Sequence, residues 1–135
     1  MQWGLGGVSL LGTRGNAETQ ALLADHDVLL LPSVYDGWGA VVNEALMLGL
    51  YVICSSRCGA KELLHSPVRG CVYPAGNVKA LAACMADVAG RVEQVRAQVP
   101  VRRAWANEHI GGQALARYMV DCLSGNQPAR PWATD

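Results

Sequence analysis

The sequence lacks the features that mark nucleic-acid-binding, membrane-spanning and secreted proteins. Its 135 residues include 11 basic and 11 acidic side chains, so the formal net charge is zero and no basic surface favours nucleic acid. No apolar run of about 18 residues, the length that spans a membrane, occurs, and no signal-peptide pattern follows Met1. We therefore expect a soluble, cytoplasmic, single-domain protein.

Common metal-binding patterns are also missing. The five cysteines are an odd number, and no two of them form the C-x2-C pair that is frequent in zinc sites. We expect these thiols to be reduced, as is usual in the cytoplasm, and to behave as small apolar side chains. A metal site built from Cys54, Cys58, Cys71 and His65 is the alternative.

One stretch, residues 36–44, carries the clearest functional signal. Residues 28–33 before it form an apolar run that predicts a buried strand, and residues 40–48 follow a helical apolar pattern. A glycine loop between strand and helix presents backbone N–H groups and the positive end of a helix dipole, which together bind phosphate. Asp36 lies in the loop and Glu44 in the helix, where their carboxylates can accept hydrogen bonds from sugar hydroxyls. This combination predicts a nucleotide-sugar site.

The rest of the chain reads as alternating strands and helices. Predicted strands span residues 8–11, 27–33, 51–55 and 70–74. Predicted helices span residues 17–24, 40–48, 78–89, 92–98, 100–109 and 113–123, with a helical turn at 61–65. Asn16 and Asn77 are the expected N-caps of two helices, and Pro100 suits a first helical turn. Residues 1–7 and 124–135 are expected to be irregular.

This alternation predicts an α/β fold with a doubly wound parallel sheet. Residues 27–33 show no alternation of apolar and polar side chains, as expected for a parallel strand that is buried on both faces. Such sheets bind ligands at the carboxyl ends of their strands. The loops at residues 33–39, 55–60 and 74–77 each follow a predicted strand, so we expect all three at one edge.

Residues 36–45 resemble the paired-acid signature of retaining GT-B glycosyltransferases of the glycosyl transferases group 1 type. That signature, E-x7-E, often occurs as E-G-F-G-x4-E-A; here Asp36 stands for the first Glu, Trp38 for Phe, and Glu44-Ala45 closes the motif. On either side, residues 27–33 and 48–55 resemble the family's flanking strands, and residues 58–63 resemble its G-G-x-x-E segment. About 70 residues from Val8 to Pro74 match in order.

The resemblance implies a carboxyl-terminal donor-binding domain, the Rossmann-like half of a GT-B fold. It implies a polysaccharide-biosynthesis enzyme that transfers a hexose from a nucleotide diphosphate to a glycan or lipid-linked acceptor with retention of configuration. Metal-independent chemistry without a cofactor is also implied, and no D-x-D-like motif occurs. The parent enzyme would be cytoplasmic, either free or held peripherally at the inner face of the membrane.

The resemblance also assigns roles to individual residues. Asp36 is the expected catalytic residue, whose carboxylate contacts the donor sugar, and Glu44 is expected to bind the nucleotide ribose. The other donor-binding candidates are Gly37, Trp38, Gly39, Ala40, Val41 and Val42, the last three through N–H groups that meet the diphosphate. Candidates for the edge of the site are Ser33, Ser55 and Glu62.

Several assignments have a structural alternative. Asp36 could be only part of an Asp-Gly turn, and it is one methylene shorter than the usual Glu. Trp38 could be a core aromatic, and Glu62 a helix-start residue that bonds the local backbone. Arg102 and Arg103 are expected on a solvated helix face.

The chain departs from the family pattern at its start. Family members carry an amino-terminal acceptor domain, and their donor domain opens with two further strands and a basic pair that grips the diphosphate. The sequence contains none of these, so residues 1–123 are interpreted as a partial donor-binding domain that is inactive alone, followed by the tail, residues 124–135. The alternative is a catalytically silent nucleotide-binding module or degenerate remnant that needs a partner chain. A dinucleotide-binding dehydrogenase half is weaker still, because no G-x-G-x-x-G follows a strand.

The missing strands have a structural consequence. In the family's strand order they lie between residues 8–11 and residues 27–33, where their loss leaves apolar strands with unpaired backbone groups. We therefore expect either that residues 8–11 pair directly with residues 27–33, or that a homodimer covers the exposed edge of the sheet.

Overall fold

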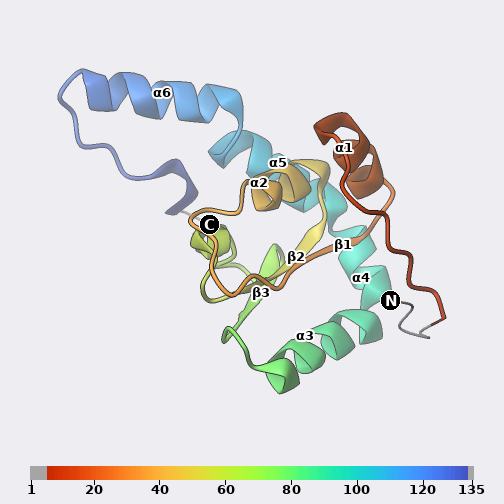
Figure 1. Ribbon diagram of the computed structural model, residues 1–135. Coiled ribbons are helices and arrows are strands. Elements are labelled where there is room, and N and C mark those ends of the chain that lie inside the picture. Colours follow the sequence, from red (N-terminus) through yellow and green to blue (C-terminus); the bar gives the residue numbers. More distant parts are fainter. Residues whose placement is uncertain (1–5, 134–135) are drawn as a thin grey trace.

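The fold is an α/β arrangement around a parallel sheet, as predicted, and three of the four predicted strands form that sheet. The structure is a computed structural model in which residues 6–133 are described (Figure 1). The strands β1 (Val28–Leu31), β2 (Tyr51–Ser55) and β3 (Gly70–Tyr73) lie in the order β1-β2-β3, and both neighbouring pairs are parallel. All five residues of the central strand β2 are buried, as expected for a strand covered on both faces.

The helices follow the predicted pattern closely. They are α1 (Asn16–Ala24), α2 (Ala40–Leu48), α3 (Val78–Gly90), α4 (Val92–Ala97), α5 (Val99–His109) and α6 (Gly112–Leu123), with short 3-10 helices η1 (Gly59–Leu63) and η2 (Pro131–Ala133). The Asn77 side chain accepts a hydrogen bond from the N–H of Ala80 at 3.0 Å, so the predicted cap of α3 is confirmed. The predicted cap of α1 is wrong: Gly15 is its N-cap, and Asn16 is the first helical residue.

Alternate residues of the strands face two separate cores. Val52 and Cys54 of β2 point into a cluster formed with α2 and α5, which includes Val42 and Trp105. Tyr51 and Ile53 point the other way, into a smaller cluster with Val88 of α3 and Val95 of α4. The sheet therefore has helices on both faces, which confirms the doubly wound arrangement.

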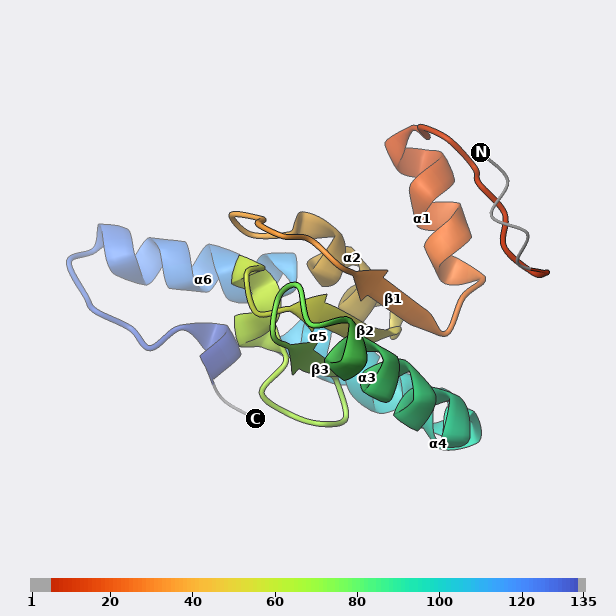
Figure 2. The ribbon, with the colours of Figure 1, turned by 60° about the horizontal axis from the view of Figure 1, so that its bottom comes forward.

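The predicted strand at residues 8–11 is wrong. These residues have no regular structure, and Val8 and Leu10 are 60% and 76% exposed. Figure 2 shows this segment beyond α1, away from the strands. Local sequence favours an extended chain here, but a strand also needs a neighbour for its backbone groups. Direct pairing of residues 8–11 with β1 is therefore wrong as well, while the homodimer stays a prediction.

Arg102 is not on a solvated helix face, which corrects that prediction for one of the two arginines. Its side chain is fully buried, and its guanidinium donates to the carbonyl oxygens of Gly49 (2.7 Å), Val68 (3.2 Å) and Val95 (2.5 Å). Burial lowers the pKa of Arg102. Arg103 is exposed, as predicted, and donates to the carbonyl oxygen of Leu48 at 2.8 Å.

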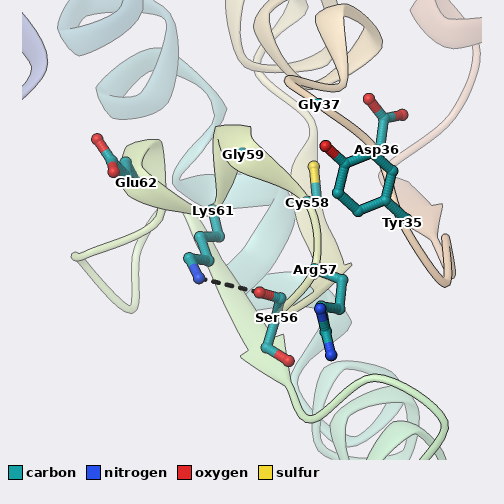
Figure 3. A pocket seen from close by; sticks show the side chains of 9 residues that line it. All are labelled: Tyr35, Asp36, Gly37, Ser56, Arg57, Cys58, Gly59, Lys61 and Glu62. Carbon is teal, nitrogen blue, oxygen red and sulfur yellow. Dashed lines mark hydrogen bonds between the residues drawn. The ribbon is translucent and has the colours of Figure 1, made fainter.

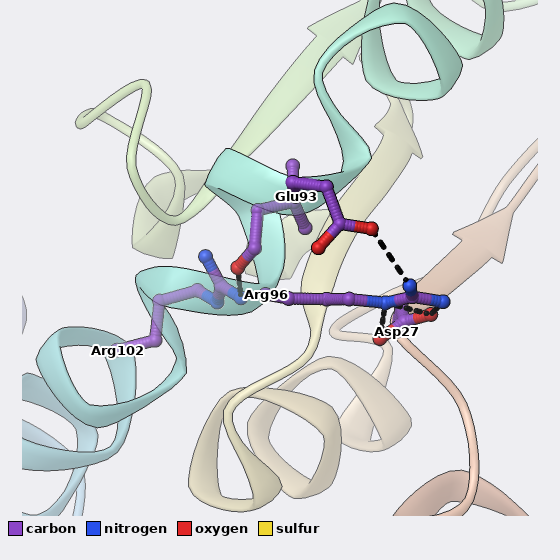
Figure 4. Close-up of polar contacts among 5 residues, drawn as sticks. Asp27, Glu93, Arg96 and Arg102 are labelled. Carbon is purple, nitrogen blue, oxygen red and sulfur yellow. Dashed lines mark hydrogen bonds and ion pairs between the residues drawn. The ribbon is translucent and has the colours of Figure 1, made fainter.

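A surface ion pair joins α4 to the start of β1 (Figure 4). Arg96 donates to the carboxylate of Asp27 at 3.0 Å and to that of Glu93 at 3.0 Å. The hydrogen bond from Arg96 lowers the pKa of Asp27. Because the side chains of Arg96 and Asp27 are 53% and 38% exposed, water screens the pair and its contribution to stability is small.

Two of the five cysteines are not free thiols, contrary to the prediction. Cys71 of β3 and Cys84 of α3 form a disulfide, because α3 packs over β3 and brings their Cα atoms within 6.8 Å. Cys54 and Cys58 are free and buried, in agreement with the expected apolar role.

The predicted irregular tail contains some regular structure. After α6, which buries none of its residues and extends away from the sheet in Figures 1 and 2, the chain returns to form η2 beside η1. Trp132 in η2 packs against the larger core cluster. The ring of Trp132 contacts aromatic rings that are far away in the sequence. Local sequence patterns do not reveal such contacts. No helix within residues 6–133 is both long and apolar enough to cross a bilayer.

Candidate functional site

A pocket of about 330 Å³ lies beyond the carboxyl ends of β1 and β2 (Figure 3). One wall is the loop that follows β1, and the other is residues 56–62, which follow β2. The lining residues are Tyr35, Asp36, Gly37, Ser56, Arg57, Cys58, Gly59, Lys61 and Glu62. The pocket thus occupies the edge where the sequence placed the site.

Backbone hydrogen bonds join the two walls. The N–H of Asp36 donates to the carbonyl of Arg57 at 3.1 Å, and the N–H of Gly59 donates back to the carbonyl of Asp36 at 3.2 Å. The N–H of Ala60 donates to the carbonyl of Trp38 at 2.6 Å. These bonds continue the parallel β1–β2 pairing past the strand ends. Gly59 permits the close approach, because a Cβ there would collide with the carbonyl oxygen of Gly37.

The loop turns into α2 at Gly39. This residue is the N-cap of α2 and has a left-handed backbone (φ 86°), and a Cβ there would lie 2.6 Å from the sulfur of Cys58. The N–H of Val42 donates to the carbonyl of Gly39 at 2.9 Å, so it is already used. Within residues 6–133, the N–H groups of Ala40 and Val41 have no hydrogen-bond partner and remain as donors at the positive end of the helix.

The two predicted carboxylates have different surroundings. Asp36 lines the pocket, and one of its oxygens accepts the N–H of Trp38 at 3.2 Å. Glu44 is the fifth residue of α2; it is half-buried and does not line the pocket. The described part of the chain offers its carboxylate no hydrogen bond or ion pair. Asp36 is therefore in the pocket, and Glu44 is outside it with free acceptor oxygens.

The Trp38 side chain packs against α2 and the tail. Its indole N–H donates to the side-chain oxygen of Asn43 at 2.8 Å, and its ring lies edge-on to Trp132, with the ring centroids 6.1 Å apart. Trp38 is not among the lining residues, although its backbone bonds to both walls. The ring contributes to packing around the site.

The three candidates for the site edge also separate. Ser55 is buried and donates its hydroxyl to the carbonyl of Ser33 at 2.5 Å, and neither serine lines the pocket. Glu62 does line the pocket, and its carboxylate accepts a hydrogen bond from Arg130 of the tail at 2.9 Å rather than from the local backbone.

Two cations of the pocket were missed by sequence reasoning. Arg57 and Lys61 both line it, and Lys61 donates to the carbonyl oxygen of Ser56 at 2.9 Å (Figure 3). Neither cation is paired with a carboxylate in the part of the chain that the structure describes. Lys61 lies in the segment that resembles the family's G-G-x-x-E, and Arg57 directly precedes it. That resemblance was the sequence signal that could have pointed to these two cations. Of the acids of the pocket, Glu62 is paired with Arg130, whereas Asp36 has no ion pair within residues 6–133.

The loop at residues 74–77, which follows β3, also reaches this edge of the sheet, as predicted. The N–H of Ser56 donates to the carbonyl of Tyr73 at 2.8 Å, and its hydroxyl accepts the N–H of Ala75 at 3.1 Å. Ser56 therefore ties the residues after β3 to the pocket wall.

The two cysteines near the pocket have structural roles. Burial, and after it the neighbouring Cys58, raise the pKa of the Cys54 thiol to about 12. The Cys58 thiol donates to the carbonyl of Trp38 at 3.1 Å. Cys54 therefore stays protonated at neutral pH and is not a nucleophile.

Comparison with known proteins identifies relatives of this chain. AmsK of Erwinia amylovora, an amylovoran biosynthesis glycosyltransferase, is 32% identical over 125 residues, which cover 83% of this chain and 30% of AmsK. WcaL of Salmonella typhimurium, a glycosyltransferase provisionally assigned to colanic acid biosynthesis, is 28% identical over 124 residues, which cover 86% of this chain and 30% of WcaL. The chain thus spans about 30% of the length of these relatives.

The fold has a solved counterpart. The crystal structure of HepE from Anabaena in complex with UDP matches with a TM-score of 0.67 and 22% sequence identity, over 77% of this chain and 29% of HepE. The profile of the family described as glycosyl transferases group 1 matches residues 1–91, which include both walls of the pocket. The chain therefore belongs to the glycosyl transferases group 1 family.

Proposed function

We propose that this chain provides the donor-binding part of a retaining glycosyltransferase that moves a hexose from a nucleotide diphosphate to a glycan or lipid-linked acceptor. The observation that carries the proposal is the pocket beyond β1 and β2, which Asp36 lines from the glycine loop that leads into α2. The family match and the polysaccharide-biosynthesis names of AmsK and WcaL support the reaction class. The UDP in the HepE crystal structure supports a uridine nucleotide as the first donor to test.

In this proposal each group acts on a different part of the donor. The N–H groups of Ala40 and Val41 meet the diphosphate, and the charges of Arg57 and Lys61 add to the positive potential beside it. Asp36 accepts a hydrogen bond from the sugar in the pocket. Glu44, which lies outside the pocket with free acceptor oxygens, binds the ribose hydroxyls.

The proposed chemistry follows from these contacts. The bond from the sugar anomeric carbon to the diphosphate oxygen breaks while the acceptor hydroxyl attacks the same face. The electron pair leaves with the diphosphate, whose oxygen takes the proton of the acceptor hydroxyl. Fixed donors aimed at that oxygen stabilise the negative charge that develops on it. Because the chain spans only part of its relatives, transfer is proposed for the whole enzyme, and nucleotide binding is the property to test on this chain.

Replacing Glu44 by Gln tests the ribose contact. We expect the affinity for UDP, measured by calorimetry with GDP and ADP as comparisons, to fall by about 1.5–3 kcal/mol, because a charged acceptor makes the stronger hydrogen bond. Glu108→Gln, an exposed residue of α5 distant in sequence from both walls, is the matched control and should bind as the unaltered chain does. Equal affinity of the Glu44 and Glu108 variants would rule out the ribose contact.

Removal of divalent metal should leave nucleotide binding unchanged. No group of three His, Cys, Asp or Glu side chains in residues 6–133 is arranged to hold a metal ion. Backbone N–H groups and cations are the proposed diphosphate ligands, so a titration of UDP in EDTA should reproduce the affinity measured in magnesium. A strict requirement for magnesium or manganese would contradict the proposed site.

A further inference from the structure

The tail contacts both walls of the pocket. Trp132 packs edge-on against Trp38, which belongs to the wall that follows β1. Two residues earlier, Arg130 forms an ion pair at 2.9 Å with Glu62, which belongs to the wall that follows β2. A short segment, Arg130–Trp132, therefore spans from one wall to the other.

This segment is anchored at several points. The ring of Trp132 also lies edge-on to Tyr118 of α6, with centroids 5.8 Å apart, and the side chain packs against the larger core cluster. Aromatic pairs in this arrangement stabilise a contact beyond the area they bury. Trp132 is therefore held in place by α6 and the core cluster, and the Trp38 side chain packs against it.

The contact with Trp38 reaches the reactive carboxylate through the backbone. The N–H of Trp38 donates to Asp36, and the carbonyl of Trp38 accepts the N–H of Ala60 from the opposite wall. A shift of Trp38 would thus turn the Asp36 carboxylate and loosen one of the bonds between the walls. Support of the ring by Trp132 restrains both.

The contact with Glu62 changes the charge of the pocket. Glu62, Asp36, Arg57 and Lys61 all line it. With Arg130 paired to Glu62, one acid of the pocket is neutralised, and an anionic ligand meets two cations against one acid. Without Arg130 the two acids would balance the two cations.

We propose that Arg130 and Trp132 are positioning residues, through which the tail holds the two pocket walls together and keeps the pocket favourable for the diphosphate of a nucleotide. The ligand in this statement rests on the proposed function, whereas the restraint of the walls does not. Trp132 acts on geometry by way of Trp38, and Arg130 acts on charge by way of Glu62.

The geometric part is tested by amide hydrogen exchange, followed residue by residue in the full chain without ligand. In Trp132→Ala the amides of Gly59 and Ala60, which bond to the opposite wall, should exchange about threefold to tenfold faster, as expected for loss of one aromatic contact. Trp132→Phe should restore most of the protection. Amides of β2 report whether the whole fold has loosened, and an equal acceleration there, or no change at Gly59 and Ala60, would overturn the proposal.

The charge part is tested by UDP titration of variants at exposed positions that leave the core intact. Arg130→Gln should weaken UDP binding about threefold to tenfold, an effect that shrinks with added salt, whereas the exposed Arg117→Gln in α6 should not. In a Glu62→Gln background, Arg130→Gln should weaken UDP binding less, because without the Glu62 carboxylate nothing holds the Arg130 guanidinium at the pocket. An equal loss in both backgrounds would overturn this role for Arg130. Absence of UDP binding by the unaltered chain would contradict the proposed function. Hydrogen exchange at Gly59 and Ala60 would still test whether the tail restrains the two walls.

Discussion

Replacing Arg102 by Met is expected to lower the free energy of unfolding by about 3–5 kcal/mol, measured by chemical denaturation. The guanidinium is fully buried and donates to the carbonyls of Gly49, Val68 and Val95. Methionine fills a similar space but donates nothing, and each buried carbonyl left without a donor costs about 1–3 kcal/mol. These carbonyls belong to the end of α2, to α4, and to the loop before β3. Their loss of hydrogen bonds therefore weakens the packing of several elements at once.

The neighbouring arginine provides the control. Arg103→Met removes the same side chain from the same helix, but Arg103 is exposed and bonds to one carbonyl, that of Leu48. We expect a loss of no more than about 1 kcal/mol. Arg102→Lys should fall between the two, because an ammonium keeps the charge but cannot span three carbonyls. Similar losses for Arg102→Met and Arg103→Met would show that the buried hydrogen bonds contribute little.

Replacing Gly59 by Ala should also have a large effect, at the pocket itself. The added Cβ would collide with the carbonyl oxygen of Gly37 and lie 3.1 Å from the Cα of Trp38, so the walls must separate. Overpacking together with the strained or lost bonds of Gly59 and Ala60 should cost about 2–4 kcal/mol of folding stability. The affinity for UDP should fall as well, because Asp36 moves with its wall.

Gly90→Ala is the matched control for this substitution. Gly90 ends α3, and a Cβ there would meet nothing within 4 Å. Alanine is the better helix former, so the control should be neutral or more stable by up to about 1 kcal/mol. If Gly59→Ala behaved like this control, the close approach of the two walls would not be needed for stability.

The fold was predictable where local signals and tertiary structure agree. The bounds of α2 match the prediction because Gly39 and Gly49 both take left-handed conformations that end the helix on either side. The prediction failed at residues 8–11, where an apolar run has no neighbouring strand to pair with. It failed for Arg102 because the three carbonyls that receive its hydrogen bonds are 7, 34 and 53 residues away in the sequence.

The site was predictable in part for the same reason. Asp36 and the start of α2 follow from the order strand, glycine loop, helix, which is local in the sequence. The cations were missed because their place in the pocket depends on β1–β2 pairing, which brings residue 57 beside residue 36. The role of the tail depends on contacts of Arg130 and Trp132 that have no local pattern.

The uncovered side of β1 also bears on how the protein resists aggregation. Within residues 6–133, β1 pairs only with β2, so its other edge offers backbone groups to any extended chain nearby. That edge is only four residues long. Pro32, which has no N–H, follows it directly, and the charged pair of Asp27 with Arg96 precedes it. A strand from another molecule therefore finds few backbone groups to bond at this edge and meets an obstacle at each end. These features limit edge-to-edge association of sheets from different molecules.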